Sequence, residues 1–382
     1  MKMRLIWVLV VVTLMAAGCA STTSNSTYDN CSETVDGITI IDVKNSGGPK
    51  IAFKDLIDSV RYVVLDESDE KALIGKYYGN IHKGGGRIIV EEHSDYPVKF
   101  FDDNGKFINA IRRGQGPGEV EFVHASCYNV AAKEFVVYNG GTVSIFDNDG
   151  NFKSKVQVPF SFDKITCLNG DYLLYRLSMY HSPNDSLNNV FLVTDNNFNV
   201  KFKALSFPEK RATSHYFGPD DHYFRNLGDR VEFPNKDTIY SYDGKTLSPV
   251  MYVVYDNKMS DAPDDKYANT MEYVSNGQTQ LFFVGSHNVG PGHNPDQHFI
   301  VRNVQSGHLF NHSHKPNFFE FLLFYGTIAL EDGTMCMAPT QNMAEYEGSK
   351  IAANFTPELK PLIKKVAEED YHVLIFFKFK DF

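Results

Sequence analysis

Histidine is the residue type that first suggests chemistry in this 382-residue chain, because six of its thirteen histidines lie between His287 and His314. On a strand, alternate side chains share a face, so His312 and His314 are expected to project together. Neutral imidazoles with a carboxylate are ligands that zinc accepts, and His293 in the intervening loop completes the candidate set. No His-x-x-His or paired cysteine spacing accompanies these residues. They are weak metal candidates, and we expect no resident metal.

A second segment, residues 215–224, mixes aromatic rings, carboxylates and imidazoles with turn-forming residues. That composition is typical of a pocket which orients a ligand. Its aspartate pair would also suit calcium, which takes oxygen ligands, although turn carboxylates usually cap backbone N–H groups and no EF-hand spacing is present. The candidate ligand contacts in this segment are His215, Tyr216, Asp220, Asp221 and His222.

The run Gly-Gln-Gly-Pro-Gly-Glu at residues 114–119 invites comparison with a phosphate-binding loop. It lacks the Gly-Lys-Ser/Thr ending of such loops, and no helix is expected after it. We therefore interpret the run as a structural turn between two strands. The alternative is that it borders a channel mouth, where the candidate ligand contacts would be Arg112, Arg113, Gln115 and Glu119.

The sequence predicts no catalytic residue. It contains no Gly-x-Ser-x-Gly nucleophile elbow, and no cysteine–histidine pair stands out. The net charge of −10, from 37 basic and 47 acidic residues, argues against nucleic acid as a partner, because phosphates require a basic face. With 42% hydrophobic and 22% charged residues, the chain is neither disordered nor a multi-span membrane protein.

The first 36 residues predict export and anchoring. A basic start at residues 1–4, an apolar run at 5–15 and a small-residue segment form a signal peptide over residues 1–18, too short to span a bilayer. Cys19 after Ala-Ala-Gly resembles a bacterial lipobox, in which the thiol is lipidated. Residues 19–36 then form a flexible polar tether. We expect a cell-envelope, outer-membrane lipoprotein that faces the periplasm or the exterior, with the membrane as a partner through this anchor.

Two of the other cysteines occupy similar points in successive repeats, Cys127 in Ser-Cys-Tyr-Asn and Cys167 in Thr-Cys-Leu-Asn. An envelope compartment permits disulfides, but four thiols beyond Cys19 are too few for a disulfide framework. We interpret Cys127 and Cys167 as small buried apolar residues and predict no structural disulfide.

A hairpin module repeats along the chain and sets the predicted fold. Each copy is a strand, a turn of Asp, Asn or Gly, and another strand, and such residues tolerate the positive φ of tight hairpins. The first copies recur at intervals of about 45 to 48 residues, with another β-rich run upstream of each, which is the size of a propeller blade. The hairpins lie at residues 100–107, 145–152, 193–200, 239–245 and 301–309.

The fold class predicted is all-β, a six-bladed β-propeller over residues 37–382. Residues 318–339 begin the sixth blade, and the terminal strands Ile38–Val43 and Val373–Phe379 are expected to complete it and so close the ring. Seven blades are the next alternative. Two β-sandwiches in series would predict no fixed period across the midpoint of the chain. The best helix candidate is Pro357–Glu369.

Several motifs resemble a known family. They are Val64-Leu65-Asp66, the hairpin at 101–107, the Arg-Gly-Gln-Gly-Pro-Gly-Glu run at 113–119 and Asp-Thr-Ile-Tyr at 237–240. Their order and spacing are similar to those of the six-bladed β-propeller lipoproteins of Bacteroidetes, an NHL-like group without assigned biochemistry. The resemblance covers most of residues 50–255. It implies the fold and an envelope location, and it brings no catalytic residues.

The favoured function is a lipid-anchored, non-catalytic module that binds a protein partner or a glycan through one face of the ring. The alternative is a metal-dependent enzyme, a calcium or zinc lactonase or lyase acting on a sugar at the propeller axis. The two differ in whether three or more His, Asp or Glu side chains converge near that axis. The oligomeric state is left open.

Overall fold

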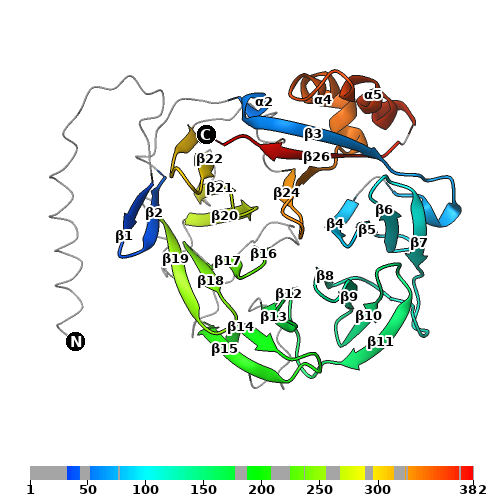
Figure 1. Cartoon of the computed structure of the whole chain (residues 1–382), viewed down its shortest axis with the longest axis horizontal. Helices are drawn as coiled ribbons and strands as arrows, with labels where there is room; N and C mark the ends of the chain where they lie inside the picture. Colours follow the sequence, from blue (N-terminus) through cyan, green and yellow to red (C-terminus); the bar gives the residue numbers. More distant parts are fainter. Residues whose placement is uncertain are drawn as a thin grey trace.

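The computed structural model describes residues 32–43, 52–75, 78–176, 187–207, 224–235, 237–254, 267–288, 296–313, 323, 326–369 and 371–381. Six sheets surround a central axis, each with one strand nearest the axis and the others progressively farther out (Figure 1). We number these blades I to VI. The predicted six-bladed β-propeller is confirmed.

Each blade follows an antiparallel order from the axis outward. Blade I is β4 (Tyr78–Gly84), β5 (Arg87–Glu92), β6 (Val98–Asp102) and β7 (Phe107–Ile111); blade II is β8 (Ala125–Asn129), β9 (Glu134–Tyr138), β10 (Thr142–Phe146) and β11 (Phe152–Gln157); blade III is β12 (Lys164–Leu168), β13 (Asp171–Tyr175), β14 (Asn189–Thr194) and β15 (Val200–Ser206). Blade IV is β16 (Arg225–Asn226), β17 (Val231–Asn235), β18 (Thr238–Tyr242) and β19 (Leu247–Val254); blade V is β20 (Tyr267–Ser275), β21 (Thr279–Asn288), β22 (Asp296–Asn303) and β23 (Leu309–Ser313); blade VI is β24 (Thr327–Ala329), β25 (Met335–Met337), β26 (Val373–Phe379) and β3 (Ile57–Val64).

All five predicted hairpins join the third strand of a blade to the fourth, in blades I to V. In blades I to IV an aspartate at the start of the turn, as in Asp102 and Asp147, accepts backbone N–H bonds of 2.8–2.9 Å from the turn. Hydrogen bonds from Asn199 lower the pKa of Asp195, and those from Thr246 lower the pKa of Asp243. The repeat in the sequence is therefore a repeat of capped turns.

The ring is closed by strands from the two ends of the described chain. β26 supplies the third strand of blade VI, and β3 pairs antiparallel with it from Val64↔Val373 to Ile57↔Phe379. The sheet thus joins chain segments that are about 310 residues apart, and it leaves no gap between the last blade and the first. Closure by N- and C-terminal strands is confirmed.

The N-terminal strand expected to close the ring is a different one. Residues Ile38–Val43 do not join blade VI: β2 (Ile38–Asp42) pairs in parallel with β19, with Ile40 opposite Tyr252, and β1 (Glu33–Val35) pairs with β2. Blade IV is thereby extended to six strands. The physical reason is connectivity. β3 directly precedes β4 in the chain. The chain therefore passes from the outer strand of blade VI to the inner strand of blade I, as it does between the other blades.

Among the described residues, the core consists of six apolar clusters, one at each interface between neighbouring blades. Aromatic rings fill much of this space, as predicted for blade aromatics: Tyr138 stacks on Phe162 with ring centroids 3.9 Å apart, and Phe191 stacks on Phe233 at 4.8 Å. Stability is therefore held in the seams between sheets rather than in one central core.

Helices cover the outside of blade VI. The predicted helix is confirmed as α5 (Leu359–Glu369), and the unpredicted α4 (Gln341–Ala353) lies antiparallel to it, both between β25 and β26. A Cβ at Gly348 would lie 2.7 Å from Ile363, so the helices pack closely at that glycine. Two short helical turns complete the described elements, α2 (Phe53–Leu56) and η1 (Glu70–Ala72). Within the described part of the chain, no helix combines the length and apolar character needed to cross a bilayer.

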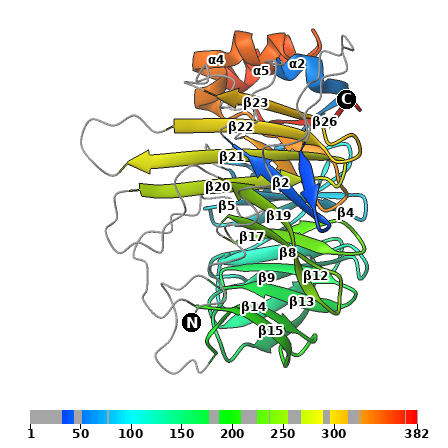
Figure 2. The same ribbon diagram turned by 90° about the vertical axis from the view of Figure 1, so that its left-hand side faces the viewer.

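The ring has two distinct faces. The turn face carries the connections between first and second strands and between third and fourth strands, and it lies at the right in Figure 2. The loop face carries the connections between second and third strands and those that pass to the next blade. The described loop-face connections include residues 65–75, 112–124 and 158–163.

Gly150 and Gly170 both adopt positive φ, but only at Gly150 would an added Cβ also overlap a neighbouring side chain. Gly150 has φ +79°, and a Cβ there would meet Phe100 at 2.7 Å, whereas Gly170 has φ +85° with open space around it. We expect Gly170→Ala to lower the free energy of unfolding by about 1 kcal/mol. Gly150→Ala should cost about 2–4 kcal/mol, since it adds overlap with a buried ring. Urea unfolding of both variants measures this, and equal losses would contradict the packing described for this turn.

Candidate functional site

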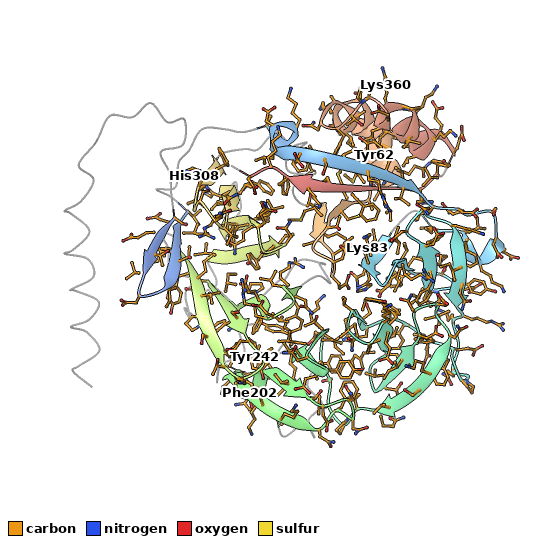
Figure 3. All side chains as sticks on the ribbon, in the orientation of Figure 1. Tyr62, Lys83, Phe202, Tyr242, His308 and Lys360 are labelled. Atoms are coloured by element: carbon orange, nitrogen blue, oxygen red, sulfur yellow. The ribbon has the colours of Figure 1, made fainter. Side chains whose placement is uncertain are left out.

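A cavity of about 30 Å³ lies on the propeller axis, and all six blades contribute to its wall. That volume holds about two water molecules, far less than a drug-sized ligand requires. Lys83, labelled in Figure 3, lies on β4, the inner strand of blade I, and contacts Asp332 of blade VI. The residues that line the cavity are His82, Ser126, Cys127, Ile165, Thr166, Phe224, Arg225, Asn226, Ser275, Ala329, Leu330 and Glu331.

One wall of the cavity is a buried cluster around His82. Its Nε2 lies 2.9 Å from Ser126 Oγ and 3.2 Å from Glu91 Oε1, and its Nδ1 is hydrogen bonded to Glu331. Asn80 Nδ2 donates to the other oxygen of Glu91 at 3.0 Å. The imidazole is thus held between two carboxylates. We call these five residues the axial cluster.

The fold brings the cluster together from three blades. Asn80 and His82 alternate along β4 and so share a face, Glu91 lies on the adjacent β5, and Ser126 lies on β8 of blade II. Glu331 lies in the turn between β24 and β25 of blade VI, where its second oxygen accepts the Lys83 backbone N–H at 3.0 Å. The axial cluster therefore forms only when closure of the ring brings blade VI against blade I.

Protonation of His82 is fixed by its neighbours. Burial by itself lowers the pKa of the imidazole, but the charges and hydrogen bonds of Glu331 and Glu91 outweigh burial and raise the pKa to about 10. The ring is therefore an imidazolium at neutral pH, with both N–H groups donating to its partners. It balances one of the two carboxylates that the cavity wall buries.

Ser126, His82 and Glu331 are linked in the order of a serine–histidine–acid triad. In such a triad the imidazole must be neutral to accept the serine proton. His82 holds both of its protons at neutral pH, and Ser126 Oγ also donates to Glu91. The arrangement therefore orients and neutralises buried charge, and it does not activate Ser126 as a nucleophile.

A second buried polar network lies between blades IV and V, behind the residues that line the cavity. Tyr273 donates to Glu232 at 2.6 Å and accepts from Gln280 at 3.0 Å, and Gln280 accepts from Arg302 at 2.8 Å. Burial and the charge of Glu232 raise the pKa of Tyr273 well above its ordinary value. Arg302 also donates to Ser32 Oγ at 2.9 Å, which ties the start of the described chain to blade V.

The binding module and the metal enzyme differ in whether three or more His, Asp or Glu side chains converge on one point near the axis. One histidine and two carboxylates do meet near the axis, but they are His82, Glu91 and Glu331 rather than any predicted residue. The carboxylates lie at opposite ring nitrogens of His82, so the three groups do not converge on one point. Among the residues that the structure describes, no set of three His, Cys, Asp or Glu side chains could hold a metal ion.

The predicted contacts in the glycine-rich run lie away from the axis. The run follows directly after β7, the outermost strand of blade I, and closes on itself: Val120 N–H donates to Arg112 O at 3.1 Å, and Gly116 N–H donates to Glu119 Oε2 at 2.9 Å. The side chains of Arg112, Arg113 and Gln115 are exposed on the loop face. The run is a structural turn in the described chain, and the cavity wall comes from other segments.

The other candidates lie partly or wholly outside the described residues. Among the histidines, His287 and His312 have described backbones on β21 and β23. These strands are separated by β22, and the register sets the two residues about four positions apart, or roughly 16 Å. Outside the described residues lie Cys19, His215, Tyr216, Asp220, Asp221, His222, His293 and His314.

The axial cluster predicts a distinctive pH dependence. His82 is protonated in the folded protein up to about pH 10 but in the unfolded chain only below about 6.5, so its stabilisation falls as pH rises above 6.5. The loss from this one proton is at most about 1.4 kcal/mol per pH unit. We expect His82→Gln to lower the free energy of unfolding at pH 6 by about 3–5 kcal/mol, because it leaves buried carboxylates unpaired.

Urea unfolding between pH 6.5 and 8.5 measures both effects. The His82→Gln variant should lack the slope that His82 contributes to the unfolding free energy of the unmodified protein. His124→Gln is the matched control, since His124 is 41% exposed and lies 3.8 Å from a single carboxylate, Asp163. An unchanged pH slope in His82→Gln would show that the imidazole is not held as an imidazolium.

Comparison with known proteins agrees with this architecture. No curated protein matches the sequence significantly. A Bacteroides fragilis structure described as a "putative exported protein" is 15% identical, with a TM-score of 0.67 over 90% of this chain and 99% of its own. The N-terminal domain of Nup159 is 10% identical, with a TM-score of 0.39 over 72% and 71% of the two chains. Residues 38–378 match the family model described as "Domain of unknown function (DUF4934)", and the chain belongs to that family.

Proposed function

We propose that this protein is an exported, lipid-anchored module that binds another protein through the loop face of its propeller, without catalysing a reaction. The observation that carries the proposal is the state of the axial cavity. It has room for about two water molecules, and the charged groups of its His82 wall are bonded to one another. A ring with so small a central cavity is suited to bind a partner on its outer surfaces, rather than to hold a substrate at its axis.

The loop face is favoured by the position of the anchor. Ser32 N–H donates to Gly307 O at 2.9 Å, so the chain enters the ring beside the turn between β22 and β23 on the turn face. Cys19 precedes Ser32 by 13 residues, which span at most about 45 Å when fully extended. A lipid on Cys19 would therefore be attached nearest the turn-face rim, on the opposite side of the ring from the loop face.

The exposed side chains of the loop face suit a protein partner. Leu73 is 54% exposed and Phe122 is 41% exposed, and they lie on consecutive connections between blades. Arg112, at the start of the second of these connections, adds a guanidinium side chain that is 72% exposed. Sugar rings favour aromatic platforms, whereas exposed aliphatic, aromatic and arginine side chains on one face are typical of protein interfaces.

The location forms part of the same proposal. The leader and Cys19 support an outer-membrane lipoprotein, and the B. fragilis structure with the similar fold is described as exported. The resemblance to NHL-like propeller lipoproteins of Bacteroidetes supports the same placement. The partner would then be another envelope or extracellular protein.

The anchor is tested by replacing the thiol. Cys19→Ser should move the protein from the membrane fraction to the soluble fraction, because no acyl chains would then hold it. Cys31→Ser is the matched control, since that thiol lies in the same polar region and should leave the protein in the membrane fraction. Metabolic labelling with a fatty-acid analogue gives an independent readout. Labelling that persists in Cys19→Ser would contradict anchoring at this residue.

The binding face is tested by two matched substitutions of exposed apolar residues. Leu73 lies on the loop face, and Val130, 46% exposed, lies in a turn-face connection. Cross-linking in intact cells would identify the partner, whose affinity would then be measured with purified proteins. We expect Leu73→Asp to weaken binding about tenfold or more, since a charge would be buried at the interface, and Val130→Asp to leave it within about twofold.

Two outcomes would contradict this function. Equal losses for the two variants would remove the assignment to the loop face. Binding of an oligosaccharide in a thermal-shift screen, with turnover of that sugar, would favour the enzyme alternative.

A further inference from the structure

Cys127 and Cys167 lie next to each other across the seam between blades II and III. Their Sγ atoms are 3.4 Å apart, and the two residues are 40 positions apart in the chain. A disulfide bond is about 2.0 Å long, so the sulfurs would need to approach by about 1.4 Å. The inner strands β8 and β12 that carry them lie side by side.

The two thiols meet because each lies on an inner strand and faces the seam that blades II and III share. Cys127 is the third residue of β8 and Cys167 the fourth of β12, and each is followed two residues later by an asparagine, Asn129 or Asn169. Cys127 faces blade III from β8 and Cys167 faces blade II from β12, and both side chains belong to the apolar cluster between these blades. The third described cysteine, Cys336, is also buried but belongs to the cluster between blades VI and I. The structure therefore contains one cysteine pair and one separate thiol among its described residues.

We propose that Cys127 and Cys167 form a disulfide bond when the chain folds in an oxidising compartment. The oxidant is a disulfide, such as oxidised glutathione or the active site of a disulfide oxidoreductase. The thiolate of one cysteine attacks this disulfide and expels a first thiolate. The second cysteine then attacks the mixed disulfide and expels the other. Two protein thiols lose two protons and two electrons, and the oxidant is reduced to two thiols.

The surroundings determine when this exchange takes place. Both side chains are about 95% buried, and burial together with the neighbouring sulfur raises the pKa of Cys127 well above its ordinary value. A buried neutral thiol reacts slowly, so the bond forms before blades II and III have packed together. Once they pack, the same burial shields the bond from reductants. The bond would tie two inner strands together directly beside the axial cavity, which Cys127 lines.

Peptide mapping tests the bond in the full mature chain. The reduced, denatured protein is refolded in a buffer of reduced and oxidised glutathione, alkylated under denaturing conditions and digested with trypsin. We expect residues 114–133 and 165–176 to appear as one linked peptide, 2 Da lighter than the sum of the separate peptides. Cys336 should be alkylated in the same sample and serves as the internal control. Alkylated Cys127 and Cys167 would overturn the proposal.

Thermal unfolding with and without reductant tests the effect on stability. The bond closes a loop of about 40 residues, so reduction should lower the unfolding midpoint by about 5 °C. The double variant Cys127→Ala/Cys167→Ala should be insensitive to reductant, and Cys336→Ala should respond as the unmodified protein does. A midpoint that reductant leaves unchanged in the unmodified protein would overturn the stabilising role. Neither experiment depends on the identity of a binding partner.

Discussion

Pairing of β3 with β26 is the interaction on which the rest of the molecule depends. Seven aligned residue pairs join segments from the two ends of the described chain, and they place blade VI against blade I. Without this pairing β26 would be the open outer edge of its sheet, which invites association with another chain. The axial cluster depends on the same closure, because Glu331 belongs to blade VI and its partner His82 to blade I. Pairing of β3 with β26 at the rim is thus needed for the contact between His82 and Glu331 at the axis.

The axial cluster shows how a closed ring deals with buried charge. Carboxylates from Glu91 and Glu331 lie where water is nearly excluded, which is unfavourable unless each one is paired. A single imidazole meets both, since its two nitrogens point in different directions. The fixed proton that results prevents His82 from acting as a general base for Ser126. Charge compensation requires a protonated imidazole, whereas base catalysis requires a neutral one. The two carboxylates favour the protonated form.

The parts of the fold that recur in the sequence could be predicted, and the parts that arise from closure could not. Each capped turn is specified locally, by an aspartate and a residue that accepts positive φ, so the hairpins and the number of blades follow from their period. The closing strand was harder to identify because Ile38–Val43 and Ile57–Val64 are both short and β-rich, and only their connectivity separates them. The axial cluster comes from three blades. Its one local signal is Glu91, a carboxylate at the end of the apolar run Ile88–Val90.

The inner strands of neighbouring blades belong to separate sheets, so side chains must join them around the axis. On β8, adjacent residues serve the two sides: Ser126 contacts His82 of blade I, while Cys127 contacts Cys167 of blade III. Alternation along a strand requires that such neighbours point in opposite directions. One seam is therefore joined at this level by a charged hydrogen-bond network and the next by two sulfur atoms. Since both contacts act on the same short strand, a displacement of β8 that relieves one of them must disturb the other. The positions of the inner strands on both sides of blade II are therefore coupled through β8.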